Sequence, residues 1–125
     1  MILYDTSAWI HYFRVGGVGF EQLKSVVVCP PVIQEVLQGI RSDSHWQLVR
    51  DGLMALPCIG NHADVSTHIV AAEIYRGGRL RGLTIRSSMD CLIAAMAIEA
   101  KVPVHHFDRD FDMIAKFTSL KIQQP

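Results

Sequence analysis

The sequence predicts an α/β protein in which helices cover both faces of a mostly parallel sheet. Three observations support this class. Short apolar runs at residues 2–4 and 26–28 are typical of strands, the second because it is entirely β-branched. Longer segments, such as residues 88–101, repeat apolar side chains with helical spacing. The two kinds of segment alternate along the chain, and this order favours a parallel sheet between helical layers.

In the first half of the chain, cap and breaker residues separate the predicted elements. The Asp-Thr-Ser run at residues 5–7 is a favourable helix start, and the glycine pair at 16–17 ends the short helix that follows. The proline pair at 30–31 suits the first turn of the next helix, over which apolar side chains recur up to Ile40. We therefore expect strands at 2–4, 26–28 and, weakly, 57–59, and helices at 8–13, 30–40 and 45–56.

The second half follows the same alternation. A helix over residues 64–75 has an apolar face, and the glycine pair at 77–78 is expected to end it. The segment 88–101 is the longest predicted helix. Pro103 lies near the start of the next strand, where proline is tolerated. We expect helices at 64–75, 88–101 and 111–117, and strands at 102–107 and 120–122.

Composition sets outer limits on function. The 125 residues, half of them hydrophobic, fit one domain spanning residues 1–125. No apolar run approaches the ~18 residues of a membrane span, and the first residues lack the regions of a signal peptide. Three cysteines without a Cys-x-x-Cys pair indicate reduced thiols and a cytoplasmic protein. The formal net charge is zero, so any case for nucleic-acid binding must rest on local clusters.

Four acidic residues are placed where they can meet. Asp5 and Asp108 each end a predicted strand, and ligands of open α/β sheets bind beyond the carboxyl ends of the strands. Glu35 lies early in a helix and Asp90 in the first turn of another, and helices that follow strands begin at that edge. Close carboxylates repel one another unless a divalent cation sits among them. Oxygen ligands suit Mg²⁺ or Mn²⁺, which can activate water and stabilise a phosphodiester under attack.

Each acid also has a purely structural interpretation. Asp5 can cap the helix that follows it. Glu35 and Asp90 are favourable charges near helix N-termini, and the run at 87–90 fits a capping box. Asp108 belongs to a group of acids suited to a solvated loop. The joint placement of the acids at one sheet edge is what favours a functional site.

Four motifs in order resemble the PIN-domain nucleases and, within them, the VapC-type toxins of toxin–antitoxin systems. Residues 3–10 (LYDTSAWI) resemble the first strand with its leading acid, and residues 35–39 (EVLQG) the second-acid helix. Residues 90–97 (DCLIAAMA) resemble the third-acid helix, and residues 106–112 (HFDRDFD) the closing motif. The resemblance covers essentially the full length. It implies a three-layer α/β/α sandwich with about four or five strands.

The resemblance also implies a function and a site. It implies RNA cleavage dependent on Mg²⁺ or Mn²⁺, a small VapB-like antitoxin as partner, and a homodimer. Either Asp108 or Asp110 can supply the fourth acid, and we prefer Asp108 because it directly follows the strand. Ser7 is either a hydroxyl that holds a metal ligand or bound water, or an ordinary helix-start residue. The expected catalytic acids are Asp5, Glu35, Asp90 and Asp108, with Asp5, Asp90 and Asp108 as metal ligands.

One local basic cluster lies in the predicted loop before the helix at 88–101. No acid lies between Glu73 and Asp90, so we expect that neighbours do not neutralise the cluster. It can hold RNA phosphates, bind acidic groups of an antitoxin, or be a solvated loop. Its members are Arg76, Arg79, Arg81 and Arg86.

Two other functions compete with the nuclease. One is a phosphatase-like phosphoryl-transfer enzyme with an aspartyl nucleophile. The residues after Asp5 argue against this function, because they are Thr6 and Ser7 and there is no second acid at position 7. The other is a binding module for RNA or protein that keeps the fold without catalysis. The presence of all four acids argues against it.

Overall fold

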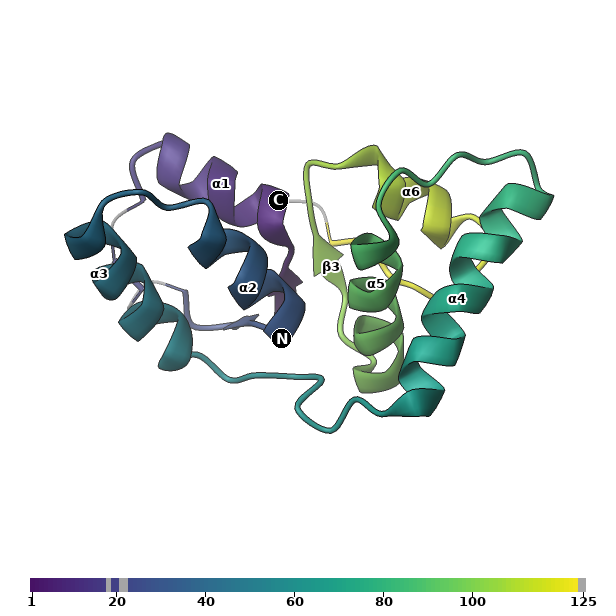
Figure 1. Ribbon diagram of the computed structural model, residues 1–125, viewed down its shortest axis with the longest axis horizontal. Coiled ribbons are helices and arrows are strands. Elements are labelled where there is room, and N and C mark those ends of the chain that lie inside the picture. Colours follow the sequence, from purple (N-terminus) through teal and green to yellow (C-terminus); the bar gives the residue numbers. More distant parts are fainter. Residues whose placement is uncertain (18, 21–22, 124–125) are drawn as a thin grey trace.

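The computed structural model describes residues 1–17, 19–20 and 23–123. Helices α1–α3 gather on one side of a short central sheet and α4–α6 on the other, as Figure 1 shows. This is the three-layer α/β/α arrangement expected from the sequence. The elements follow in the order β1 (Ile2–Tyr4), α1 (Thr6–Arg14), β2 (Val26–Val27), α2 (Pro30–Gln38), α3 (Asp43–Met54), α4 (Val65–Leu80), α5 (Ser88–Ala100), β3 (Val104–His105) and α6 (Arg109–Ala115).

The sheet is parallel, with β1 between β2 and β3. The carboxyl ends of all three strands therefore lie at one edge, where α1 and α6 begin. Isolated parallel bridges, Val28 to Cys58 and Val104 to Ile122, extend the pairing on either side. The expected four or five strands are thus three strands and two single bridges among the described residues, because each predicted edge strand pairs at one residue only.

Helix α5 forms the centre of the core. Ile93, Ala94 and Ala97 on this helix are completely buried, and the helix packs against α2, α4 and α6. A helix that is apolar on nearly all sides needs such enclosure. Asp90, in the first turn of this helix, is therefore buried rather than exposed at a free helix end.

The end of α4 differs from the prediction. The glycine pair at 77–78 was expected to end this helix, but the helix continues to Leu80. Tertiary packing overrides the low helix propensity of glycine here, because the returning chain lies directly against the helix. A Cβ at Gly78 would be 2.6 Å from the Cδ1 of Ile85. The first part of the arginine cluster is consequently helical rather than a loop.

Other boundaries change less. The strand expected at 102–107 is confined to β3, and the chain then turns toward α6. The glycine pair at 16–17 does follow the end of α1, with Gly16 at a φ of 96°, a conformation that favours glycine. Within the described part of the chain, no helix combines the length and apolarity required to cross a membrane.

Candidate active site

Asp5 lies at the junction of β1 and α1. Its Oδ1 accepts the backbone N–H of Ala8 at 2.8 Å, so Asp5 caps α1 as one interpretation of the sequence expected. The residue is only 2% exposed, and burial raises the pKa of its carboxyl group. The capping bond therefore fixes the Asp5 carboxyl group, whose pKa is raised, at the edge of the sheet where the strands end.

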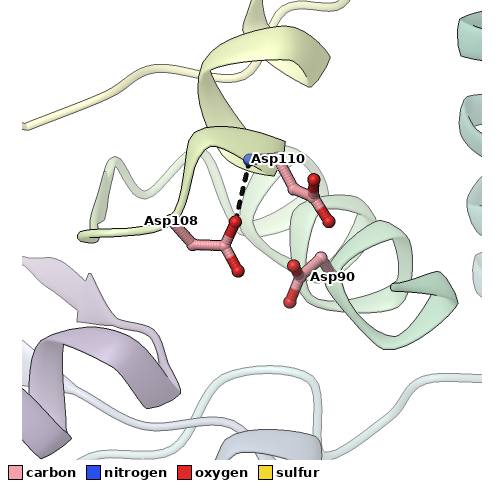
Figure 2. A group of neighbouring side chains, drawn as sticks. All are labelled: Asp90, Asp108 and Asp110. Atoms are coloured by element: carbon pink, nitrogen blue, oxygen red, sulfur yellow. Dashed lines mark hydrogen bonds between the residues drawn. The ribbon is translucent and has the colours of Figure 1, made fainter. Parts of the chain in front are cut away.

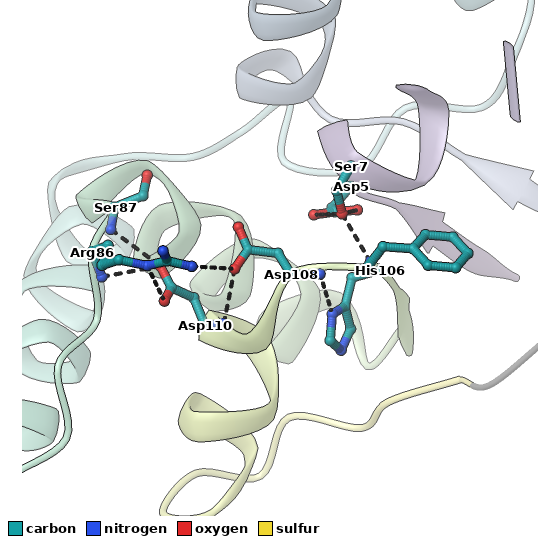
Figure 3. A network of polar contacts seen from close by, with 8 residues as sticks. Asp5, Ser7, Arg86, Ser87, His106, Asp108 and Asp110 are labelled. Atoms are coloured by element: carbon teal, nitrogen blue, oxygen red, sulfur yellow. Dashed lines mark hydrogen bonds and ion pairs between the residues drawn. The ribbon is translucent and has the colours of Figure 1, made fainter. Parts of the chain in front are cut away.

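Ser7 connects Asp5 to the opposite side of this edge. Its hydroxyl donates to the Asp5 carboxylate, with Oγ 2.7 Å from Oδ1 and 2.8 Å from Oδ2. The same oxygen accepts the backbone N–H of Phe107 at 2.9 Å. Figure 3 shows Asp5 and Ser7 beside the segment of His106. Ser7 therefore ties the start of α1 to the chain that leads into α6.

Three aspartates from α5 and α6 converge at the same edge, and we call them the aspartate trio: Asp90, Asp108 and Asp110. One carboxylate oxygen of each lies within 4.8 Å of the others. Figure 2 shows the three side chains directed toward a common space between the two helices. Asp108 also caps α6, because its Oδ1 accepts the N–H of Asp110 at 2.9 Å. Two of the trio are thus adjacent on one helix turn, and the third faces them.

The trio is an unfavourable arrangement without a cation. Burial is the largest cause that raises the pKa of Asp90 to about 8, and the charges of Asp108 and Asp110 raise it further. The charge of Asp5 also contributes, so Asp5 lies within electrostatic range of the trio. Among the described residues, Asp90 Oδ2 and Asp110 Oδ1 are buried and have no hydrogen-bond partner. Unpartnered carboxylate oxygens that face one another fit a hard divalent cation.

Arg86 lies beside the trio, and its ion pairs correct the expectation that no neighbouring acid neutralises the arginines. Its guanidinium is 3.9 Å from both Asp108 Oδ1 and Asp110 Oδ1, which is an ion pair but too long for a hydrogen bond. The backbone N–H groups of Arg86 and Ser87 also donate to Asp110 Oδ2, at 3.1 and 3.2 Å. Figure 3 shows these contacts. Asp110 thereby positions the chain just before α5, while the Ser87 side chain forms no capping bond.

His106 orients Asp108 in a way that sequence reasoning missed. Its Nδ1 accepts the backbone N–H of Asp108 at 3.0 Å, and its Nε2 lies 3.1 Å from Asp112 Oδ1. A neutral ring with its proton on Nε2 satisfies both contacts. The sequence shows only a histidine two residues before an aspartate, a pattern too common to identify the role.

The comparisons with known proteins decide the family. The model of the PIN domain matches residues 2–117, nearly the whole chain. The chain belongs to the PIN-domain family. It is 38% identical over 130 residues to VapC ribonuclease Mb1587 of Mycobacterium bovis and to ribonuclease VapC11 of Mycobacterium tuberculosis, with 97% of this chain and 96% of each relative covered. The family expected from the four motifs is thereby confirmed.

Solved structures agree on the PIN fold. VapBC-1 from nontypeable Haemophilus influenzae is similar with a TM-score of 0.75 and 14% identity, covering 99% of this chain and 98% of that one. VapBC2 from Rickettsia felis, bound to a DNA fragment from its promoter, has a TM-score of 0.77 and 16% identity, covering 100% and 99%. At these identities the likeness concerns the fold alone.

The second expected acid of this PIN domain, Glu35, lies outside the trio and contacts the start of α1. Glu35 is the sixth residue of α2, not an early one. Its Oε1 accepts the hydroxyl of Thr6 at 2.8 Å, and Thr6 follows Asp5 in the chain. The structure therefore brings Asp90, Asp108 and Asp110 together. It places Asp5 within electrostatic range of them, and Glu35 is bonded to the residue that follows Asp5.

The arginine cluster is divided among three environments. Arg76 and Arg79 line a groove of about 640 Å³ between α4 and α5. Arg81 donates to the carbonyl of Gly77 and lies over the ring of Phe117 at 4.8 Å. Arg86 alone among the four lies at the trio. The cluster expected from sequence spacing is therefore not a single surface of four cations.

Proposed function

We propose that this PIN domain is the toxin of a type II toxin–antitoxin system and an endoribonuclease that depends on Mg²⁺ or Mn²⁺. The observation that carries the proposal is the aspartate trio, two of whose oxygens are buried without a hydrogen-bond partner among the described residues. It occurs in a chain 38% identical to proteins named VapC ribonucleases. The whole chain, residues 1–125, is proposed to act as a single nuclease domain.

The residues of the acidic site have different proposed roles. We assign a divalent ion to Asp90 and Asp108 with Asp5, and the position of Asp110 in the trio makes it a further ligand. A bound ion would supply activated water and stabilise charge on the phosphodiester. Ser7 holds the Asp5 carboxylate, and His106 holds the backbone of Asp108.

Glu35 completes the proposed catalytic set. Its carboxylate is held by the hydroxyl of Thr6, so it is oriented toward the start of α1, where Asp5 lies. Glu35 lies outside the trio. We therefore assign it the role of positioning a water molecule or accepting a proton, without direct ligation of the ion.

The proposed partners follow the relatives. The similar solved structures from Haemophilus influenzae and Rickettsia felis are VapBC complexes, which supports a VapB-like antitoxin for this chain. We also propose a homodimer, RNA as the substrate and a cytoplasmic location. The arginines are proposed to bind RNA phosphates or the antitoxin, and Arg86 is the one best placed for a phosphate at the trio.

RNA cleavage by the purified protein tests the function. We expect cleavage with Mg²⁺ or Mn²⁺ and none in EDTA. Asp5→Asn and Asp90→Asn should each lower the rate at least ~100-fold, because charge at the ion is lost while shape is kept. Asp51→Asn is the control, since Asp51 is exposed on α3 and pairs only with surface side chains.

Two results would overturn the proposal. Full RNA cleavage in EDTA would contradict the metal mechanism. Release of phosphate from a phosphomonoester without RNA cleavage would instead favour the phosphatase-like function.

A further inference from the structure

An exposed aromatic residue adjoins the acidic site in the chain. Phe107 directly precedes Asp108 of the trio, and half of the residue is exposed. Its ring stacks on the ring of His11 from α1, with 4.1 Å between centroids and 27° between planes. Packing in the core does not explain an aromatic side chain of this size that stays half exposed.

The Phe107 ring is held in place from several directions. Its backbone N–H donates to Ser7 Oγ, the hydroxyl that also holds Asp5. The ring of His105 meets it edge-on at 5.2 Å and 74°. The side chain therefore presents a fixed aromatic surface to solvent, and little conformational entropy is lost when a flat ligand covers it.

We propose that Phe107 and His11 form a stacking platform for a nucleobase of RNA next to the phosphodiester held at the trio. The inference rests on the proposed ribonuclease function and names a residue pair that binds the substrate. Bases of single-stranded RNA stack on exposed aromatic side chains, and such stacking tolerates any base because each has a π face. Phe107 is linked to Asp5 by its bond to Ser7, and it is the residue before Asp108 in the chain. In this proposal a base stacked on the platform therefore lies next to the reacting phosphate.

The charge pattern of α1 favours RNA over an apolar peptide. Ser7, His11 and Arg14 are spaced as i, i+4 and i+7, so they lie along one face of α1. Arg14 is exposed at the end of that face, where it can contact the phosphate that follows the stacked base. A polar ring and a guanidinium beside Phe107 suit a nucleotide better than they suit an apolar side chain of a protein partner.

Binding of fluorescein-labelled single-stranded RNA tests the platform, with Asp90→Asn in every variant so that the RNA stays intact. Phe107→Leu should weaken binding by about 5- to 100-fold, the usual effect of one lost base stack. Phe107→Trp should keep the affinity of the Asp90→Asn parent or exceed it. The control is Ile10→Ala, since Ile10 is similarly exposed on α1 but forms no part of the stack, and it should leave binding unchanged.

An abasic RNA of equal length separates stacking from a general structural effect. Phe107→Leu should then bind as tightly as the parent, because the RNA has no base to stack. Equal affinity of Phe107→Leu and the parent for ordinary RNA would overturn the platform, and so would an equal loss on abasic RNA. Wild-type RNA affinity with weakened antitoxin binding would also overturn it and identify a partner surface. If wild type neither binds nor cleaves RNA, both the platform and the proposed function are wrong. If Phe107→Leu in the otherwise wild-type protein leaves RNA cleavage unaffected, only the platform is wrong.

Discussion

Replacing Asp90 with asparagine should stabilise the metal-free protein at neutral pH. The pKa of Asp90 is raised from 3.8 to about 8, chiefly by burial. At acid pH below 3.8 the carboxyl is protonated in both states and folding carries no penalty. As pH rises toward 8, the unfolded chain releases the proton while the folded chain keeps it, so stability falls by about 1.4 kcal/mol per pH unit. Asparagine has no such proton to lose.

The size of the effect follows from the same shift. By about pH 7 the folded wild type has lost up to about 4 kcal/mol relative to acid pH through this one group. Asp90→Asn should recover much of that amount. Its amide can also donate to Asp110 Oδ1, which has no hydrogen-bond partner among the described residues of the wild type. The control Asp51→Asn removes an exposed carboxylate and should change stability by less than about 1 kcal/mol.

Metal should narrow the difference in stability between the two proteins. An ion present at about 100 times its dissociation constant stabilises the form that binds it by about 2.7 kcal/mol. For a domain of this size that corresponds to a Tm increase of about 10 °C. Wild type should show this increase with Mg²⁺, and Asp90→Asn should show little of it.

Urea and thermal melts of both proteins, with Mg²⁺ and with EDTA, at about pH 5 and pH 7, measure these terms. The reasoning is refuted if Asp90→Asn is less stable than wild type in EDTA at neutral pH and gains as much from Mg²⁺. That outcome would make Asp90 a helix-start charge, whose removal costs a few tenths to about 1 kcal/mol.

Three further substitutions test the packing and the supports of the site. Gly78→Ala should be about 1–2 kcal/mol less stable than Gly77→Ala in urea melts, because its Cβ would lie 2.6 Å from buried Ile85, whereas the nearest atom to a Cβ at Gly77 is 3.1 Å away; equal stabilities would contradict the close approach. Lys101→Gly should raise stability by about 0.5–1 kcal/mol, because Lys101 ends α5 with a φ of 57°; a loss on thermal melting would show that the lysine side chain matters more than its backbone. Ser7→Ala should lower stability by about 1–2 kcal/mol, because it leaves the Phe107 N–H and the Asp5 carboxylate without a shared partner; unchanged melts would contradict this link.

The sequence predicted well what local signals encode. The Asp-Thr-Ser run after β1 identified both the start of α1 and Asp5, since an N-cap and its helix are adjacent in the chain. The apolar pattern of 88–101 identified α5 and its first turn. The acids at the ends of β1 and β3 were expected at one edge, because parallel strands end together.

What was missed depends on contacts between distant residues. The continuation of α4 through Gly78 requires Ile85 to pack on it, and the helix-breaking tendency of glycine gives no hint of this. Arg86 finds its acidic partners more than 20 residues away on α6, so counting nearby charges could not identify them. The entry of Asp110 into the trio follows from the cap that Asp108 forms at the start of α6, a local geometry that the spacing of the acids left open.

The central claim is that the aspartate trio binds the ion on which RNA cleavage depends. Titration of Mn²⁺ followed by electron paramagnetic resonance, with RNA cleavage measured at the same concentrations, tests it most directly. Binding and activation should share one midpoint in wild type, and Asp108→Asn and Asp110→Asn should each weaken binding and activation together. Mn²⁺ binding that is unchanged in both variants, or cleavage that proceeds without bound metal, would contradict the account.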